Sequence, residues 1–212
     1  YYTIFVREIE TNKIITKEIY DTSGSITFSL DDKYIFYSKL DNNHRARKIY
    51  RHKLGNLDKS DDLIFEEKSE AFTVGINLSS DEKYYFISSS DHNTSEQYYF
   101  DVDEKIPNPK LIKKRRKGIL YSINSWDSKF YNHTNEDAED FKIDISDSLE
   151  KQNWRTFVAA KNEVLIGSCM FLKNWILRSE TSNALDKLFV KNINSGIEEE
   201  IIFSDEPVCV PN

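Results

Sequence analysis

Several residue types are scarce in this sequence of 212 residues, and each scarcity excludes a class of protein. Glycine occurs only six times, and the sequence has no G-x-S-x-G pentapeptide, the strained turn that presents the nucleophile of many hydrolases. Gly24-Ser25 and Gly167-Ser168 both lack its flanking residues. No apolar run approaches the roughly 18 residues of a membrane-spanning helix. We therefore assign no catalytic residue and expect no membrane partner.

Histidine is also rare, and its positions argue against a metal site. The sequence has four, at least eight positions apart and without a near cysteine or histidine: His44, His52, His92 and His133. We expect no metal and no cofactor, since a zinc site needs several such ligands at close spacing. His44 stands near Asp41, and His92 stands beside Asp91 in the corresponding loop. Such residues either line the mouth of a pore as ligands or order their loops by hydrogen bonding, and we expect the second role.

Cysteine occurs twice, both times in an apolar stretch. Cys169 and Cys209 are 40 positions apart, and they either form a disulfide or remain buried thiols. We expect thiols and a reducing, cytoplasmic location. Three Asn-x-Ser/Thr triplets, which begin at Asn77, Asn93 and Asn132, match the acceptor pattern for glycosylation. In a sequence rich in asparagine such triplets arise by chance, and they do not change this expectation.

The chain has no excess of basic residues, with 29 Lys and Arg against 36 Asp and Glu and a net charge of −7. A nucleic-acid-binding surface must be positive to neutralise phosphates, so we expect no nucleic-acid partner. One basic run, Lys113–Lys117, and one acidic run, Asn135–Asp140, stand out. Each directly adjoins an expected strand. We interpret both as solvated loops, rather than as a nucleic-acid patch and a docking site for basic peptides.

Aromatic residues are abundant, and they follow a repeating pattern. Tyr and Phe supply 25 of the 28 aromatic residues, and their flat rings favour strands. A block of 45 to 50 residues recurs four times, each copy with a turn that leads into an aromatic residue. These turns are Leu30–Tyr34, Ser80–Tyr84, Trp126–Phe130 and Phe171–Trp175, and their last residues are 50, 46 and 45 positions apart. Such a period with strand content is typical of β-propeller blades.

Each block reads as four strands, because alternating apolar and polar runs flank a continuous apolar run. We expect an all-β fold with four complete, four-stranded antiparallel blades at 21–70, 71–117, 118–161 and 162–204. Their expected strands are 25–30, 34–38, 48–54, 63–67, 72–78, 84–87, 97–102, 109–112, 119–123, 129–133, 141–145, 154–158, 164–166, 175–178, 187–190 and 200–203. A partial blade precedes them at 1–20, with strands Tyr2–Ile9 and Ile14–Ile19, and a stub follows at 205–212. We expect at most one helical turn, at Ser146–Lys151.

The number of blades leaves the closure of the ring open. A seven-bladed ring at about 46 residues per blade needs roughly 320 residues, more than this chain has. The chain either closes a ring of four or five blades or is part of a larger propeller. Open blades expose unpaired strand edges, which favour self-association with another copy. The chain also begins at Tyr1, without methionine and within the pattern, so we expect a fragment of a longer protein.

Several loop-and-strand segments are similar to those of a known family. The segments are Asp41–Arg45, Tyr50–Gly55, Asp61–Asp62, Glu66–Glu67, Ile87–Glu96, Thr134–Asn135, Asp137–Ala138, Asp140–Lys142, Glu180 and Asn183–Leu185. In this order, along nearly the whole chain, they resemble the propeller of the oligopeptidase B (protease II) group within the prolyl oligopeptidase family of serine peptidases. Ala46 and Asn56 replace the usual proline and threonine, and Asp32 and Glu82 replace turn glycines. These departures bear on loop rigidity and not on membership.

The resemblance implies part of a seven-bladed propeller that covers an α/β-hydrolase domain in a serine peptidase that cuts short peptides after Lys or Arg. In that family the propeller admits unfolded peptides and excludes folded proteins. The catalytic serine, aspartate and histidine lie in the hydrolase domain, and no position here corresponds to them. Peptide substrates would thus be partners only through the missing domain. The acidic loop residues Asp41, Asp91, Glu136 and Asp137 would steer cationic peptides towards it.

Two other interpretations stay open beside this one. The chain is also compatible with a stand-alone propeller that serves as a protein-interaction scaffold. A small closed propeller with its own carboxylate-based hydrolase activity is the other, although the sequence spacing identifies no pair of carboxylates for it. In the interpretation that we favour, the fragment itself is not catalytic.

Overall fold

The computed structural model describes residues 1–56 and 61–202, and this part of the chain consists of strands joined by turns and loops. Seventeen strands and no helix are present in these ranges, so no helix there could span a membrane. At Ser146–Lys151, where at most one helical turn was expected, β12 ends and the chain makes a turn over residues 149–151. The chain turns there because Ser146 Oγ donates to the Ser148 carbonyl (2.9 Å). The chain divides into two compact units, Tyr1–Gly118 and Ile119–Asn212.

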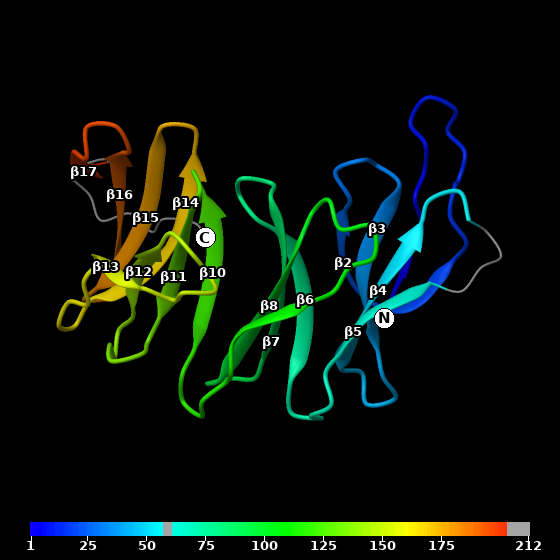
Figure 1. The fold of residues 1–212 in the computed structure, drawn as a ribbon, viewed down its shortest axis with the longest axis horizontal. Coiled ribbons are helices and arrows are strands. Elements are labelled where there is room, and N and C mark those ends of the chain that lie inside the picture. Colours follow the sequence, from blue (N-terminus) through cyan, green and yellow to red (C-terminus); the bar gives the residue numbers. More distant parts are fainter. Residues whose placement is uncertain (57–60, 203–212) are drawn as a thin grey trace. The chain divides into compact units, whose positions relative to one another are not determined.

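The first unit holds two antiparallel sheets in which strands consecutive in sequence lie side by side (Figure 1). Its first sheet has the order β1-β2-β3-β4-β5, and its second has the order β6-β7-β8-β9. The strands are β1 (Tyr2–Ile4), β2 (Ile19–Phe28), β3 (Tyr34–Leu40), β4 (Ala46–Lys53), β5 (Asp62–Glu66), β6 (Thr73–Leu78), β7 (Tyr84–Ser90), β8 (Ser95–Asp101) and β9 (Lys110–Lys113).

The two strands expected within the first twenty residues form a hairpin but not a sheet of their own. Tyr2 pairs with Thr22, and Arg7 pairs with Ile14. The second arm of this hairpin continues into β2, since Thr22 also pairs with Lys39 of β3. The hairpin therefore joins the first sheet as an added strand on the free side of β2. A separate partial blade is not present at this end of the described chain.

The turn between β2 and β3 explains why the repeat carries serine and aspartate. Ser29 Oγ donates to Asp31 Oδ1 (2.7 Å) and accepts the amide of Tyr34 (2.9 Å), which closes the turn. The next residue, Asp32, has φ +54°, a left-handed conformation that favours glycine. The corresponding turn between β6 and β7 places Glu82 at φ +57°. The two residues that replace turn glycines thus occupy strained backbone positions.

The core of the first unit lies between its two sheets. Phe36 and Ile49 of the first sheet pack against side chains of the second, and all of these are buried: Val74, Ile76, Tyr85, Ile87 and Phe100. Side chains alternate between the faces of a strand, so Ile35 and Tyr37 point to the other face of β3. There they pack with Ile4 and Ile19 of the hairpin. The continuous apolar run in β3 is therefore buried on both faces, as its sequence predicts.

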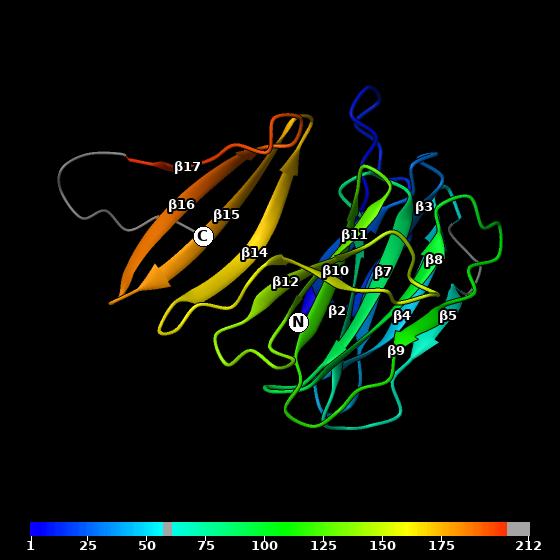
Figure 2. The same cartoon turned by 60° about the vertical axis from the view of Figure 1, so that its left-hand side comes forward.

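The second unit repeats this plan with two four-stranded sheets of consecutive antiparallel strands, ordered β10-β11-β12-β13 and β14-β15-β16-β17 (Figure 2). The strands are β10 (Tyr121–Trp126), β11 (Lys129–Thr134), β12 (Lys142–Ser146), β13 (Arg155–Val158), β14 (Leu165–Leu172), β15 (Trp175–Ser182), β16 (Leu185–Asn192) and β17 (Glu198–Ile201). Two of the hairpins turn through residue pairs with positive φ at both positions, Asp127-Ser128 and Asn183-Ala184. Such two-residue turns match the right-handed twist of paired strands.

The core of the second unit is again formed between sheets. Tyr131, Ile143 and Ile145 pack with Ile166, Phe171 and Ile176 across the two sheets, and each is buried. Each repeat has thus become one antiparallel sheet, and the all-β fold of four propeller blades is confirmed. The stub expected at 205–212 and its Cys209 lie outside the described residues. Cys169 is half-buried in β14.

Candidate functional site

The β3–β4 and β7–β8 loops hold the acidic residues expected to order them. Asp41 Oδ1 accepts the amides of Asn43 (2.8 Å) and Arg45 (3.0 Å), and Arg47 Nε donates to Asp41 Oδ2 (2.6 Å). These contacts, with the Arg45 amide foremost, lower the pKa of Asp41. Asp91 accepts two backbone amides in the same way, at 2.9 and 2.8 Å. Both carboxylates are therefore engaged in loop hydrogen bonds.

The acidic run of the third blade has a similar local role. The Glu136 amide donates to Thr134 Oγ1 (3.1 Å), and Asp137 takes a φ of +55°. The following Ala138 is buried, which turns the loop back onto its own sheet. The structure therefore places Glu136 and Asp137 in a loop equivalent to those of Asp41 and Asp91, one in each blade.

The histidines lie apart and have separate surroundings. His44 (φ +61°) hydrogen-bonds the Tyr1 hydroxyl, and His92 is exposed in its turn. His133 Nε2 donates to the Ile166 carbonyl (2.7 Å), and its burial lowers its pKa. His52 is fully buried and its Nδ1 lies 2.8 Å from Asp61. Residues 1–56 and 61–202 contain no group of three or more side chains able to hold a metal ion.

One residue of the basic run is half-buried and belongs to an ion network that the sequence did not predict. Arg115 Nη2 donates to Glu67 Oε2 (2.6 Å) and to Glu96 Oε1 (2.9 Å). Its guanidinium also lies over the ring of Phe72, 4.0 Å from the centroid. Lys114, Arg116 and Lys117 beside it are exposed, as expected of a solvated loop.

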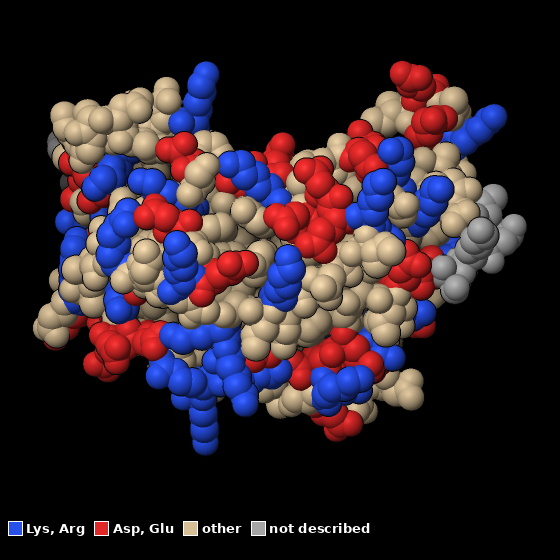
Figure 3. Space-filling model, in the orientation of Figure 1, with Lys and Arg blue, Asp and Glu red and all other residues tan. Residues whose placement is uncertain are grey.

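Figure 3 shows acidic and basic side chains mixed over the face in view.

The two carboxylates of this network are buried to the same extent, with 4 % of Glu67 and of Glu96 exposed. Ser89 Oγ donates to Glu67 (2.5 Å), and the Tyr98 hydroxyl donates to Glu96 (2.6 Å). Burial acts to raise the pKa of Glu67, but the donors around it, Ser89 first, outweigh burial and lower it. Glu67 follows β5 and Arg115 follows β9. The network therefore ties two successive interblade linkers to strand β8, and we call it the linker latch.

A related arrangement occurs in the second unit. Glu180 in β15 is 4 % exposed and accepts Lys161 Nζ (2.5 Å) and Arg178 Nη1. Lys161 lies in the linker between β13 and β14, so a buried glutamate again holds a cation from an interblade linker. Burial opposes ionisation of Glu180, yet these two cations lower its pKa. The repeat period did not reveal either cluster, because their members come from different positions of the repeat.

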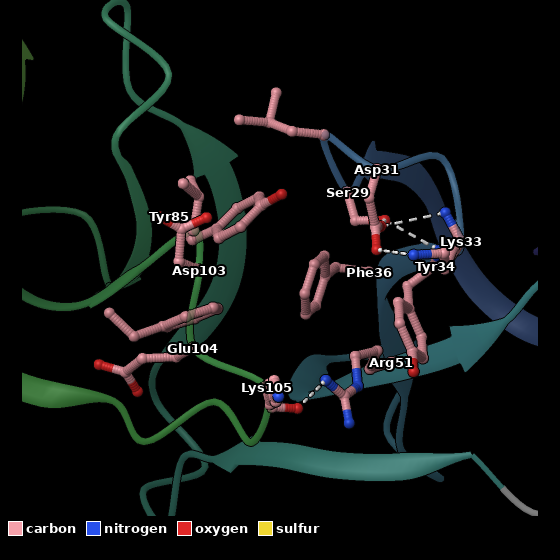
Figure 4. Close-up of a pocket in the computed structure, with 13 residues that line it drawn as sticks. Ser29, Asp31, Lys33, Tyr34, Phe36, Arg51, Tyr85, Asp103, Glu104 and Lys105 are labelled. Carbon is pink, nitrogen blue, oxygen red and sulfur yellow. Dashed lines mark hydrogen bonds and ion pairs between the residues drawn. The ribbon is translucent and has the colours of Figure 1, made fainter.

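A cleft of about 470 Å³ opens in the first unit between the β2–β3 turn and the loop that joins β8 to β9 (Figure 4). Phe36, Tyr85 and Phe100 close its base, with ring centroids 4.8 to 5.9 Å apart. Charged side chains of both signs surround its mouth. Sequence analysis missed this site, since its two walls are about 70 positions apart in the chain and only the packing of the two sheets brings them together.

Comparison with known proteins gives the family directly. Residues 1–209 match the family model described as "Prolyl oligopeptidase, N-terminal beta-propeller domain". The chain belongs to this family. Protease 2 of Moraxella lacunata is 30% identical over 212 residues, which cover 98% of this chain and 30% of that protein. Dipeptidyl aminopeptidase BI of Pseudoxanthomonas mexicana is 25% identical over 210 residues, 97% of this chain and 28% of that protein.

Solved structures agree with this assignment. Oligopeptidase B from Leishmania major superposes with a TM-score of 0.88 at 21% identity, over 96% of this chain and 30% of that one. Oligopeptidase B from Trypanosoma brucei superposes with a TM-score of 0.83 at 22% identity, over 91% of this chain and 28% of that one. The resemblance seen in the sequence, to the propeller of this peptidase family, is confirmed. The chain spans about three-tenths of the length of these proteins.

Proposed function

We propose that this chain is the substrate-gating propeller part of a serine peptidase of the oligopeptidase B type, which hydrolyses short peptides after Lys or Arg. The observation that carries the proposal is the match of residues 1–209 to the propeller of prolyl oligopeptidases. The chain itself is not catalytic in this proposal. Peptide substrates reach the reaction centre through a further domain, and the propeller controls which of them enter.

The blades support such a role physically. Consecutive antiparallel pairing satisfies the backbone of each sheet, and each pair of sheets packs through a continuous apolar core. The buried ion clusters at Arg115 and Glu180 fix the linkers between blades. A stiff scaffold of this kind restricts access by size, because a folded protein cannot deform to pass it.

Electrostatic steering of cationic peptides is part of the proposal. Asp41, Asp91, Glu136 and Asp137 share one loop position in successive blades, and the chain carries a net charge of −7. Asp41 is paired with Arg47, so we expect it to contribute least of the four. Neutralising the other three in the whole protein should weaken the salt dependence of the rate at which a basic peptide is captured.

The decisive experiment uses the whole protein, of which this chain forms a part. We expect cleavage of a short peptide after Lys or Arg, no cleavage of the matched peptide with norleucine at that position, and no cleavage of a folded protein that carries the same segment. Cleavage of folded and short substrates at equal rates would contradict the gating role. Equal rates for the lysine and norleucine peptides would contradict the specificity.

Self-association through open strand edges belongs to the same proposal for the chain by itself. The mass of the 212-residue chain in solution, measured by light scattering over a range of concentrations, tests it. We expect a dimer or a larger assembly that dissociates on dilution. A monomer at every concentration would contradict self-association and leave the peptidase assignment untouched.

A further inference from the structure

The cleft of the first unit contains charged groups that are already paired and others that are not. On one wall, Lys33 Nζ lies 3.0 Å from Asp31 Oδ2, and Ser29 donates to the same carboxylate. Arg51 donates to Asp62 (2.8 Å). At the lower end of Figure 4, it also donates to the Lys105 carbonyl (2.9 Å). These two cations are therefore engaged by the protein itself.

The opposite wall, the loop after β8, carries carboxylates that can still accept a hydrogen bond or an ion pair. Asp103 is exposed and makes no hydrogen bond or ion pair within the part of the chain that the structure describes. Glu104 accepts the Asn108 amide (3.1 Å) and lies 3.5 Å from Lys110, a loose ion pair that leaves its carboxylate accessible. Asp103 thus lines the cleft without a partner among the described residues, whereas the Glu104 carboxylate points away from Phe36 and Arg51 in Figure 4.

Apolar groups accompany these acids at the mouth. Leu30 on the β2–β3 turn is 47% exposed, and Val102 on the opposite wall is half-buried. The aromatic base below them is closed, with Phe36, Tyr85 and Phe100 exposed by 3%, 2% and 1%. A ligand in the cleft therefore meets aliphatic side chains first and carboxylates beside them.

This combination fits a side chain with an aliphatic stem and a cationic head. We propose that the cleft is a binding site for a lysine or arginine side chain of an extended peptide, with the cation on Asp103 and the stem on Leu30 and Val102. Lys105 is exposed and also lines the cleft. In this proposal its long side chain turns to solvent when the site is filled. The proposal deepens the proposed function, on which it rests for the choice of a peptide as ligand.

A stacked cation already exists next to this site and shows that its chemistry suits such groups. The Arg51 guanidinium lies over the ring of Tyr34, 4.5 Å from the centroid, on the same wall of the cleft. The Arg51 side chain thus stacks on an aromatic ring and also pairs with an acidic residue, Asp62. A peptide cation in the cleft would use Leu30 and Asp103 in the same manner.

The test uses the 212-residue chain and the probe acetyl-Ala-Lys-Ala-amide, with binding followed by amide chemical shifts in NMR spectra. We expect saturable shifts in the loop Val102–Lys105 and at Leu30, and none there with the norleucine or glutamate analogue of the probe. Asp103→Asn should weaken binding about fivefold, the effect of an exposed ion pair, and Glu104→Gln should weaken it less, since that carboxylate points away from the cleft. The matched control is Glu139→Gln, at an exposed acid of the second unit, which changes the net charge equally and should leave binding unchanged.

Three results would overturn the site. They are binding of the norleucine analogue with equal affinity, shifts that map outside the cleft, and an Asp103→Asn variant that binds as well as the control variant. The cleavage assay on the whole protein does not depend on these measurements. If the probe does not bind at the cleft but the whole protein still cleaves after lysine, this site alone is refuted. If the probe binds but the whole protein does not cleave, the proposed function is refuted.

Discussion

Replacing Arg115 by alanine should destabilise the first unit by about 3 kcal/mol. The change removes the shared donor of Glu67 and Glu96, which are both 4% exposed, and leaves two carboxylates buried without a cation. Breaking a buried ion pair from one side costs about 3 to 5 kcal/mol. Arg115 keeps 26% of its side chain exposed, so we place the cost at the lower end. Lost stacking on Phe72 is included in this figure.

Urea unfolding followed by circular dichroism measures this cost, and Lys114→Ala is the matched control. Lys114 precedes Arg115 in the same run but is exposed, so its loss should change the free energy of unfolding by less than about 0.5 kcal/mol. Hydrogen exchange gives a local readout, because the Ser69 and Arg115 amides donate to Glu67 and Glu96. Both amides should exchange faster in Arg115→Ala and at the original rate in Lys114→Ala.

The pH dependence of the variant distinguishes the linker latch from simple packing. In the original chain the pKa of Glu67 is lower in the folded than in the unfolded state. Its contribution to stability is therefore present above the unfolded pKa and is lost as the pH falls through the folded pKa. Without Arg115, burial dominates and the folded pKa of Glu67 rises, so mild acid should relieve part of the deficit. A deficit below about 1 kcal/mol at neutral pH, or one independent of pH, would refute the reasoning.

Two further predictions concern backbone strain and thiol chemistry. Ala184 has φ +59° in the β15–β16 turn, and Ala184→Gly should raise the free energy of unfolding by about 0.5 to 1 kcal/mol in a thermal melt. Asn183 beside it already tolerates this conformation, and an unchanged or lower melting temperature would contradict the strain argument. Burial raises the pKa of Cys169 to about 12, so a thiol reagent in mildly alkaline buffer should modify it far more slowly in the folded chain than in urea. Equal rates in the two states would show that the thiol is not shielded.

The sequence predicted the strands well because their signal is local. A continuous apolar run indicates a strand buried on both faces, and β3 lies at the run Tyr34–Ser38. Alternation indicates a strand buried on one face, and β6 lies at the alternating segment Thr73–Leu78. The turn residues Ser29 and Asp31 likewise act within six positions. The N-terminal hairpin was recognised as two strands, but its assignment to a separate blade was wrong, because its second arm shares Thr22 with the pairing of β3.

The linker latch and the cleft could not be predicted in this way. The basic run gave no sign that Arg115 differs from Lys114, since the side chain that turns inward is chosen by Glu67, 48 positions earlier. The cleft depends on the β2–β3 turn lying opposite the loop after β8. Contacts between residues so far apart in the sequence leave no periodic pattern along the chain. Both features arise only when one sheet packs on the next.

The sequence by itself determined the repeat, the strands and their turns, because these follow from alternation and spacing within a few tens of residues. Its loop and strand segments also indicated the prolyl oligopeptidase propeller family, but by resemblance and not by spacing. The tertiary structure decided which charges are structural and which are free. Asp41 and Arg115 are engaged in loops and linkers, while Asp103 at the cleft has no hydrogen bond or ion pair among the residues that the structure describes. The physical reason is that the role of a charged side chain depends on the group with which it pairs, and these groups come together only when the sheets pack.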